Sequence, residues 1–161
     1  MSWQKSRAVR RRSCPYMDQS KFEAAIDLVL SRAPQYDRPA YHFLRDALEY
    51  TVKERKKASG QGGHVTGQQL LDGIRRYALK QFGPMVPSVL EYWGIQRTED
   101  FGNMVFALVD VGVFGKTEQD SIEDFKEVYS FEEAFVAPFR PSSPQPSISR
   151  IQADSPAAEL N

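Results

Sequence analysis

The sequence contains a single cysteine, Cys14, and a lone thiol cannot close an internal disulfide bond. This cysteine usage fits a reducing compartment. Histidine is also scarce, since His42 and His64 are the only two in the chain. A structural zinc site takes about four nitrogen or sulfur ligands at short paired spacings. The sequence therefore predicts no metal site.

Long apolar runs and an excess of one charge are lacking as well. No stretch approaches the roughly 18 apolar residues of a membrane-spanning helix, and the basic N-terminus lacks the apolar core of a secretory signal. The 161 residues carry 21 basic and 21 acidic side chains, so no overall field favours nucleic acid or a membrane. These absences predict a cytoplasmic protein without a membrane partner.

Catalytic and nucleotide-binding motifs are missing too. The cluster of Gly60, Gly62 and Gly63 precedes no Lys-Ser/Thr pair, so it predicts a flexible connection rather than a phosphate loop. His42 and Asp46 are four residues apart on a predicted helix. This spacing fits a catalytic histidine that acts as a general base and is oriented by a carboxylate. It equally fits an ordinary histidine on a helix surface. Nothing else converges on His42, so we predict no catalytic residue and no cofactor.

Apolar residues recur at three- and four-residue spacing and predict five helices between residues 18 and 140. The predicted starts are a capping box of Ser20 with Glu23, an N-cap at Asp37, a capping box of Thr66 with Gln69, and an N-cap at Thr98. These local signals set the number and order of the helices before any packing is considered.

The apolar stripes of these helices predict which side chains are buried. The second stripe includes Leu48 and Val52, and the fifth includes Val105 and Val109. Trp93 ends the short fourth helix, where we expect it to be wedged between the third and fifth helices. The two N-terminal helices are expected to pack on the last three.

The periodicity changes after Gly112. A β-hairpin from about 113–117 to 124–129 and an ordered loop both fit this segment, and Ser130 with Glu133 predicts one last helical turn. Helix, turn, helix and hairpin is the order of a winged helix-turn-helix. The predicted fold is therefore mainly α, a five-helix single domain with a winged-helix-like unit and a small β-hairpin or ordered loop.

Both ends of the chain differ in composition from its middle. Residues 1–17 hold five basic and no acidic side chains, and the chain from 141 to 161 is rich in Pro and Ser. Neither segment has a stripe to bury, so we predict a disordered basic arm over 1–17, a single helical domain over 18–140 and a disordered tail over 141–161. The candidate nucleic-acid contacts of the arm are Arg10, Arg11 and Arg12.

The order of four segments carries a family resemblance. They are RPAYHFLRDALEYTVK, HVTGQQLLDGIRRYALKQFGPM, VLEYWGIQRTEDFGNMVFALVDVGVFGKTEQDS and EDFKEVYSFEEAF. Together, over roughly residues 20–140, they resemble an uncharacterised protein family restricted to planctomycetes and verrucomicrobia. The resemblance implies a bacterial, cytoplasmic protein. It implies no activity and no functional residues.

Aromatic and acidic residues are concentrated in the second half of the chain. Residues 99–133 include ten acidic residues and two lysines, which gives this segment a net charge of −8. This segment is either a solvated face or a docking surface for a basic partner. Two aromatic residues fall off the helix stripes, and either pack on the first two helices or form an exposed apolar patch. The candidate partner surface is Tyr92, Phe106, Glu118, Asp120, Glu123 and Asp124.

The sequence favours a non-enzymatic adaptor or binding protein that contacts another protein through its helical surface. The alternative is a nucleic-acid-binding regulator with a winged-helix-like unit and the basic N-terminal arm. The acidic residues around the predicted fifth helix oppose phosphate, so we expect the core not to bind duplex DNA. Weak, non-specific binding of nucleic acid through the arm remains compatible with the sequence.

Overall fold

The computed structural model describes residues 18–60 and 63–142, and within these ranges the chain is mainly helical. The predicted basic arm and all but the first two residues of the predicted tail lie outside the described residues. The α-helices are α1 (Gln19–Arg32), α2 (Arg38–Ser59), α3 (Gly67–Phe82), α4 (Val86–Tyr92) and α5 (Thr98–Asp110). The short turns are η1 (Gly83–Met85), η2 (Ile122–Phe125), η3 (Glu132–Val136) and η4 (Ala137–Phe139). The prediction of a mainly α, five-helix domain is confirmed for this part of the chain.

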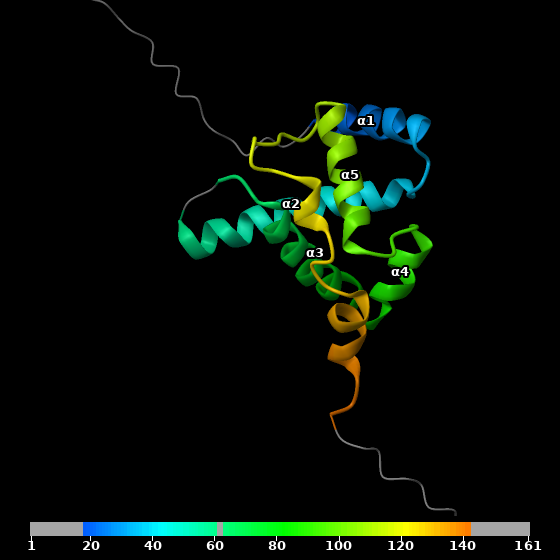
Figure 1. Ribbon diagram of the computed structural model, residues 1–161, viewed down its shortest axis with the longest axis vertical. Coiled ribbons are helices and arrows are strands. Elements are labelled where there is room, and N and C mark those ends of the chain that lie inside the picture. The colour runs from blue at the N-terminus through cyan, green and yellow to red at the C-terminus, as the bar shows by residue number, and fades with distance from the viewer. Residues whose placement is uncertain (1–17, 61–62, 143–161) are drawn as a thin grey trace, which may run out of the picture.

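One hydrophobic core joins all of these helices. α5 contacts α1, α2 and α3, which places it at the centre of the arrangement in Figure 1. The first two helices therefore pack on the later ones, as predicted. No helix among the described residues is both long and apolar enough to span a membrane. The large, fully buried side chains include Phe22, Tyr41, Leu44, Leu71, Phe101 and Phe135.

α2 packs most extensively against α3, and the two helices approach closely at Gly73. A Cβ atom added to Gly73 would lie 1.7 Å from the Oγ1 atom of Thr51. The Thr51 hydroxyl is buried but satisfied, because it donates a hydrogen bond of 2.7 Å to the carbonyl of Ala47. Only a residue without a side chain fits against α2 at this position.

The start of α1 corrects the predicted capping box. Asp18 is the N-cap, and its carboxylate accepts hydrogen bonds from the amide (3.1 Å) and hydroxyl (2.8 Å) of Ser20. Glu23 lies 3.0 Å from Arg38 in an ion pair with α2. The prediction of a Ser20–Glu23 capping box was wrong. Asp18, two residues before Ser20, is the N-cap, and the carboxylate of Glu23 pairs with α2 instead.

The other predicted starts lie at or next to the observed ones. Thr66 and Gln69 form the predicted capping box of α3, with hydrogen bonds of 3.1 and 3.3 Å. For α5, Arg97 rather than Thr98 is the N-cap. The carboxylate of Asp100 accepts hydrogen bonds from the amides at 96 (2.8 Å) and 97 (3.0 Å), where a negative charge also favours the helix dipole.

The segment after α5 is an ordered loop, and the described residues contain no β-strand. The hairpin alternative is therefore not what the chain adopts, and the likeness to a winged helix is not confirmed. Phe125, in η2, anchors this loop. A Cβ atom added to Gly67 or to Gly102 would lie 2.9 or 2.8 Å from the Phe125 side chain. The two glycines thus leave room for the ring of Phe125, and we call this space the seat of Phe125. The ring fixes the loop against α3 and α5.

The last helical turn docks through aromatic side chains. The hydroxyl of Ser130 accepts a hydrogen bond of 3.2 Å from the amide of Glu133, which is one half of the predicted capping box, but the N-cap of the turn is Phe131. Phe135 is fully buried. Tyr129 donates a hydrogen bond of 2.9 Å to the carbonyl of Leu71, and burial of its side chain raises the pKa of its phenol well above the ordinary value.

The position of Trp93 differs from the prediction. Its ring contacts Phe43 (5.4 Å between centroids) and Phe82 (5.8 Å), which also contact each other, so it packs against α2 and α3 rather than between α3 and α5. The side chain is half-buried. Trp93 is the C-cap residue of α4, which ends at Tyr92.

We expect Trp93→Ala to lower the free energy of unfolding by about 2 kcal/mol, less than the roughly 3–5 kcal/mol of a fully buried aromatic residue. Two ring contacts are lost, but part of the indole is already in water. Thermal unfolding measures this loss. The neighbouring Tyr92 is 79% exposed, so Tyr92→Ala is the matched control and should leave the melting temperature nearly unchanged. Equal effects of the two changes would contradict this placement of Trp93.

Candidate functional site

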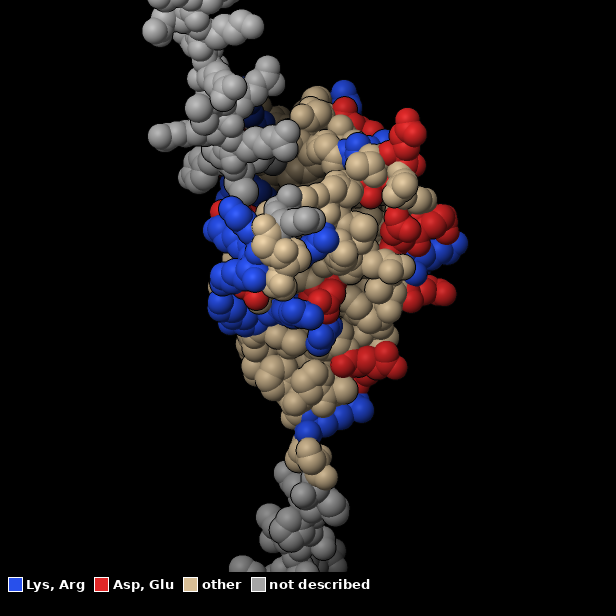
Figure 2. Space-filling model, turned by 90° about the vertical axis from the view of Figure 1, so that its left-hand side faces the viewer, with Lys and Arg blue, Asp and Glu red and all other residues tan. Residues whose placement is uncertain are grey.

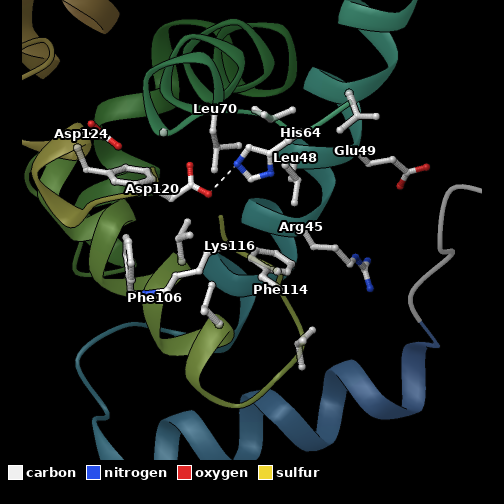
Figure 3. A pocket seen from close by; sticks show the side chains of 18 of the residues that line it. Arg45, Leu48, Glu49, His64, Leu70, Phe106, Phe114, Lys116, Asp120 and Asp124 are labelled. Carbon is white, nitrogen blue, oxygen red and sulfur yellow. Dashed lines mark ion pairs between the residues drawn. The ribbon is translucent and has the colours of Figure 1, made fainter. Parts of the chain in front are cut away.

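A pocket of about 620 Å³ lies between α2, α5, the start of α3 and the loop after α5. Figure 3 shows side chains from these elements converging on it. The loop contributes a wall because Phe125 holds it against Gly67 and Gly102. The apolar lining includes Leu48, Val52, Val105, Phe106, Val109 and Phe114.

The pocket is lined by residues that the sequence pattern assigned to the core. Leu48 and Val52 belong to the predicted stripe of the second helix, and Val105 and Val109 to that of the fifth. All four are half-exposed and line the cavity instead of being fully buried. Only part of each apolar stripe is fully buried in the core. The remaining residues of the two stripes line the pocket.

Phe106 forms one side of the pocket. Its ring packs edge-on against Phe125, with 6.3 Å between centroids. The ammonium group of Lys116 lies 5.5 Å from the centroid of the Phe106 ring, within the range of a cation–π contact. This aromatic residue fell off the predicted helix stripe because its partner is the loop, not another helix.

A polar bridge crosses one edge of the pocket. The Nε2 atom of His64 lies 2.7 Å from Oδ2 of Asp120, as the dashed line in Figure 3 marks. The carboxylate of Asp120 also accepts a hydrogen bond of 2.7 Å from the amide of Thr117. On the other side, the carbonyl of His64 accepts a hydrogen bond of 2.5 Å from Arg55. The bridge therefore connects the chain before α3 to the loop after α5.

These contacts change the acidity of Asp120. Burial alone would raise the pKa of its carboxyl, but hydrogen bonds from Thr117 and His64 outweigh burial and hold the pKa below its ordinary value of 3.8. A lowered pKa in the folded state means that the ionised carboxylate stabilises the fold. That contribution is present above pH 3.8 and is lost as the pH falls below it.

We expect Asp120→Asn to be less stable than the unchanged chain near pH 7. The difference should narrow progressively below about pH 4, because the carboxyl becomes protonated first in the unfolded state and, at lower pH, in the folded state. Urea unfolding at a series of pH values measures the difference. Glu118→Gln is the control, because Glu118 is an exposed acid in the same loop. A difference that stays constant down to pH 3 would contradict a role for the carboxylate charge.

The predicted partner surface is spread over two parts of the molecule. Three of its members line the pocket: Phe106, Asp120 and Asp124. Two more, Glu118 and Glu123, are exposed on the same loop but outside the lining. Tyr92 is exposed at the end of α4 and is not part of the pocket. Whether these residues bind a partner stays a prediction, and Arg10, Arg11 and Arg12 lie outside the described residues.

His42 and Asp46 do not form the pair that their spacing allows. The Nε2 atom of His42 lies 3.0 Å from Glu23 of α1, and its ring packs edge-on against Phe22. Asp46 instead forms an ion pair of 3.0 Å with Arg45. In the part of the chain that the structure describes, no three His, Cys, Asp or Glu side chains come close enough together to hold a metal ion.

Sequence reasoning missed Lys116 and the bridge between His64 and Asp120. The two bridge residues are 56 positions apart in the sequence, and no local spacing connects them. Lys116 lies in a segment that was interpreted by its net negative charge, so a role for a single lysine was not predicted. One signal was available in the sequence, because Phe106 falls off the predicted stripe of the fifth helix and lines the pocket.

Comparison of the chain with protein-family models, with curated proteins and with solved structures gave no match. The family resemblance seen in the sequence therefore stays a prediction, and the candidate site rests on the geometry alone.

Proposed function

We propose that this chain is a non-enzymatic binding protein, and that the pocket between α2, α5 and the following loop holds a small apolar molecule. The supporting observation is a cavity of about 620 Å³ whose walls include half-exposed apolar side chains from two helices. Ligand pockets typically measure about 300–1,000 Å³ and are lined mostly by apolar groups. Covering such surface gains roughly 25 cal/mol per Å², which is the free energy that a ligand would recover.

The polar residues of the pocket support binding rather than catalysis. Among the described lining residues there is no Ser, Thr, Cys or Tyr side chain to serve as a nucleophile. His64 is the one histidine among the described lining residues, and its Nε2 atom already contacts Asp120. A site built from apolar walls and a few polar groups is suited to hold a molecule without transforming it.

The test is titration of the full chain with N-phenyl-1-naphthylamine, an uncharged apolar fluorophore. Val109→Trp should fill part of the cavity and weaken binding by at least about tenfold, which is 1.4 kcal/mol. Leu28→Trp is the matched control, because Leu28 is 42% exposed on α1 and does not line the pocket. Melting curves establish that both variants are folded. Equal binding by the two folded variants, or no binding by the unchanged chain, would refute the proposal.

A second candidate function, the nucleic-acid-binding regulator, is favoured by the distribution of charge. Figure 2 shows Lys and Arg side chains gathered on one side of the face that it presents, with Asp and Glu on the other. α2 contributes Lys53, Arg55, Lys56 and Lys57 near its end. Ion pairs within the helix offset part of this charge, because Lys53 pairs with Glu49 and Lys57 with Glu54. Such a surface supports only weak, salt-dependent contact with phosphates.

Fluorescence anisotropy with labelled single-stranded RNA and duplex DNA tests this alternative across a salt series. We expect changing Arg10, Arg11 and Arg12 together to Ser to abolish the residual binding. Changing Lys56 and Lys57 together to Ser is the control and should have a smaller effect. Sequence-selective binding that survives the change of the three arginines would favour the regulator over the binding protein.

A further inference from the structure

Lys116 differs from the other charged residues of the pocket. Its ammonium group lies over the ring of Phe106, and in the part of the chain that the structure describes no carboxylate forms an ion pair with it. The rest of the side chain is exposed. A face of an aromatic ring attracts a cation but does not neutralise it. A positive charge is therefore available next to an apolar wall.

The remaining lining charges have partners within the protein. Lys53 forms an ion pair of 2.8 Å with Glu49 on α2. Arg45 pairs with Asp46 at 3.0 Å and also lies over the ring of Phe22. These pairs lie on the α2 side of the pocket, and Figure 3 shows Arg45 and Glu49 on the side opposite Phe106 and Lys116.

The two acidic residues on the loop are satisfied as well. Asp120 contacts His64 at 2.7 Å and accepts the hydrogen bond of Thr117. Asp124 accepts a hydrogen bond of 3.0 Å from the amide of Ser121. Because these carboxylates remain near the loop wall, they would repel a group that carries two negative charges about twice as strongly as a group that carries one. The arrangement suits a single negative charge placed at Lys116.

We propose that the pocket binds an apolar monoanion of the fatty-acid type, with its carboxylate on Lys116 and its hydrocarbon chain on the half-exposed valines of α2 and α5. This inference rests on the proposed function and names the class of molecule that the pocket takes. The carboxylate and the ammonium group form a charge-assisted hydrogen bond. The hydrocarbon chain covers Val52, Val105 and Val109, which are half-exposed and line the cavity.

The experiment compares dodecanoate, dodecanol and dodecyltrimethylammonium, which share one hydrocarbon chain and differ in the charge of the head group. The experiment measures how well each compound displaces N-phenyl-1-naphthylamine from the full chain, at concentrations below the critical micelle concentration of that compound. Dodecanoate should compete at about tenfold lower concentration than dodecanol, a difference of 1.4 kcal/mol. The cation should compete least well.

Lys116→Met removes the charge and keeps an unbranched side chain over the Phe106 ring. In this variant dodecanoate should lose its advantage, whereas dodecanol should compete as before. Lys126→Met is the matched control, because Lys126 pairs with Glu123 on the same loop at 3.4 Å and does not line the pocket. In that variant dodecanoate should keep its advantage over dodecanol.

The outcomes separate this inference from the proposed function. Equal competition by dodecanoate and dodecanol, or the same loss in both lysine variants, would overturn the anionic ligand and leave an apolar pocket in place. Strongest competition by dodecyltrimethylammonium would show that the loop acids select a cation, which also overturns the inference. Absence of any fluorophore binding to the unchanged chain would overturn both proposals.

Discussion

Gly73→Ala is expected to lower the free energy of unfolding by about 3 kcal/mol, at the upper end of the usual cost of overpacking. An alanine inside a helix would by itself gain about 1 kcal/mol over glycine. Here the added Cβ would lie 1.7 Å from Thr51 Oγ1 and 2.8 Å from its Cβ. Rotation of the Thr51 side chain relieves the first contact but not the second, so α2 and α3 must separate.

Thermal and urea unfolding measure the loss. For a domain of this size, 3 kcal/mol corresponds to a fall in melting temperature of roughly 10 °C. Gly63→Ala is the matched control, because a Cβ added there meets nothing within 4 Å. Adding Thr51→Ala to Gly73→Ala should recover part of the stability, since the two residues are in direct contact. A Gly73→Ala chain that melts like the unchanged one would contradict this packing of α2 on α3.

Phe125→Ala is expected to cost about 3–5 kcal/mol and to open the pocket at the same time. The Phe125 side chain is 3% exposed, and it fills the seat formed by Gly67 and Gly102. Its removal leaves a cavity there and takes away the ring that supports Phe106. The loop that carries Lys116 then loses its anchor.

Two measurements check this prediction. The melting temperature should fall far more for Phe125→Ala than for Ile122→Ala, because Ile122 lies in the same turn but is 44% exposed. At a temperature where both variants are folded, Phe125→Ala should also bind N-phenyl-1-naphthylamine more weakly. Unchanged fluorophore binding by a destabilised Phe125→Ala chain would show that the loop wall does not define the pocket.

The two predictions connect the fold to the candidate site. The α2–α3 pair at Gly73 fixes one wall, and Phe125 fixes the other by joining the loop to α3 and α5. Both depend on glycines inside helices, where the missing side chain lets another element approach closely. Stability and ligand binding should therefore fall together at Phe125, whereas Val109→Trp should affect binding more than stability.

The sequence by itself determined the helices and most of their ends. The Thr66–Gln69 box is an interaction across one turn, and Asp37 before Pro39 is a start that neighbouring residues define. Such signals do not depend on distant parts of the chain. The capping error at Ser20 has the same local nature, because Asp18 accepts the hydrogen bond of the Ser20 amide that the predicted box assigned to Glu23.

Only the tertiary structure decided where the site lies. A stripe of apolar residues indicates which face avoids water, but not which neighbour covers it or how completely. Leu48 and Val109 therefore looked like core residues, although they line a cavity. The bridge between His64 and Asp120 and the seat of Phe125 join segments far apart in the chain. Long-range packing fixes such contacts, and no spacing within a single helix encodes them.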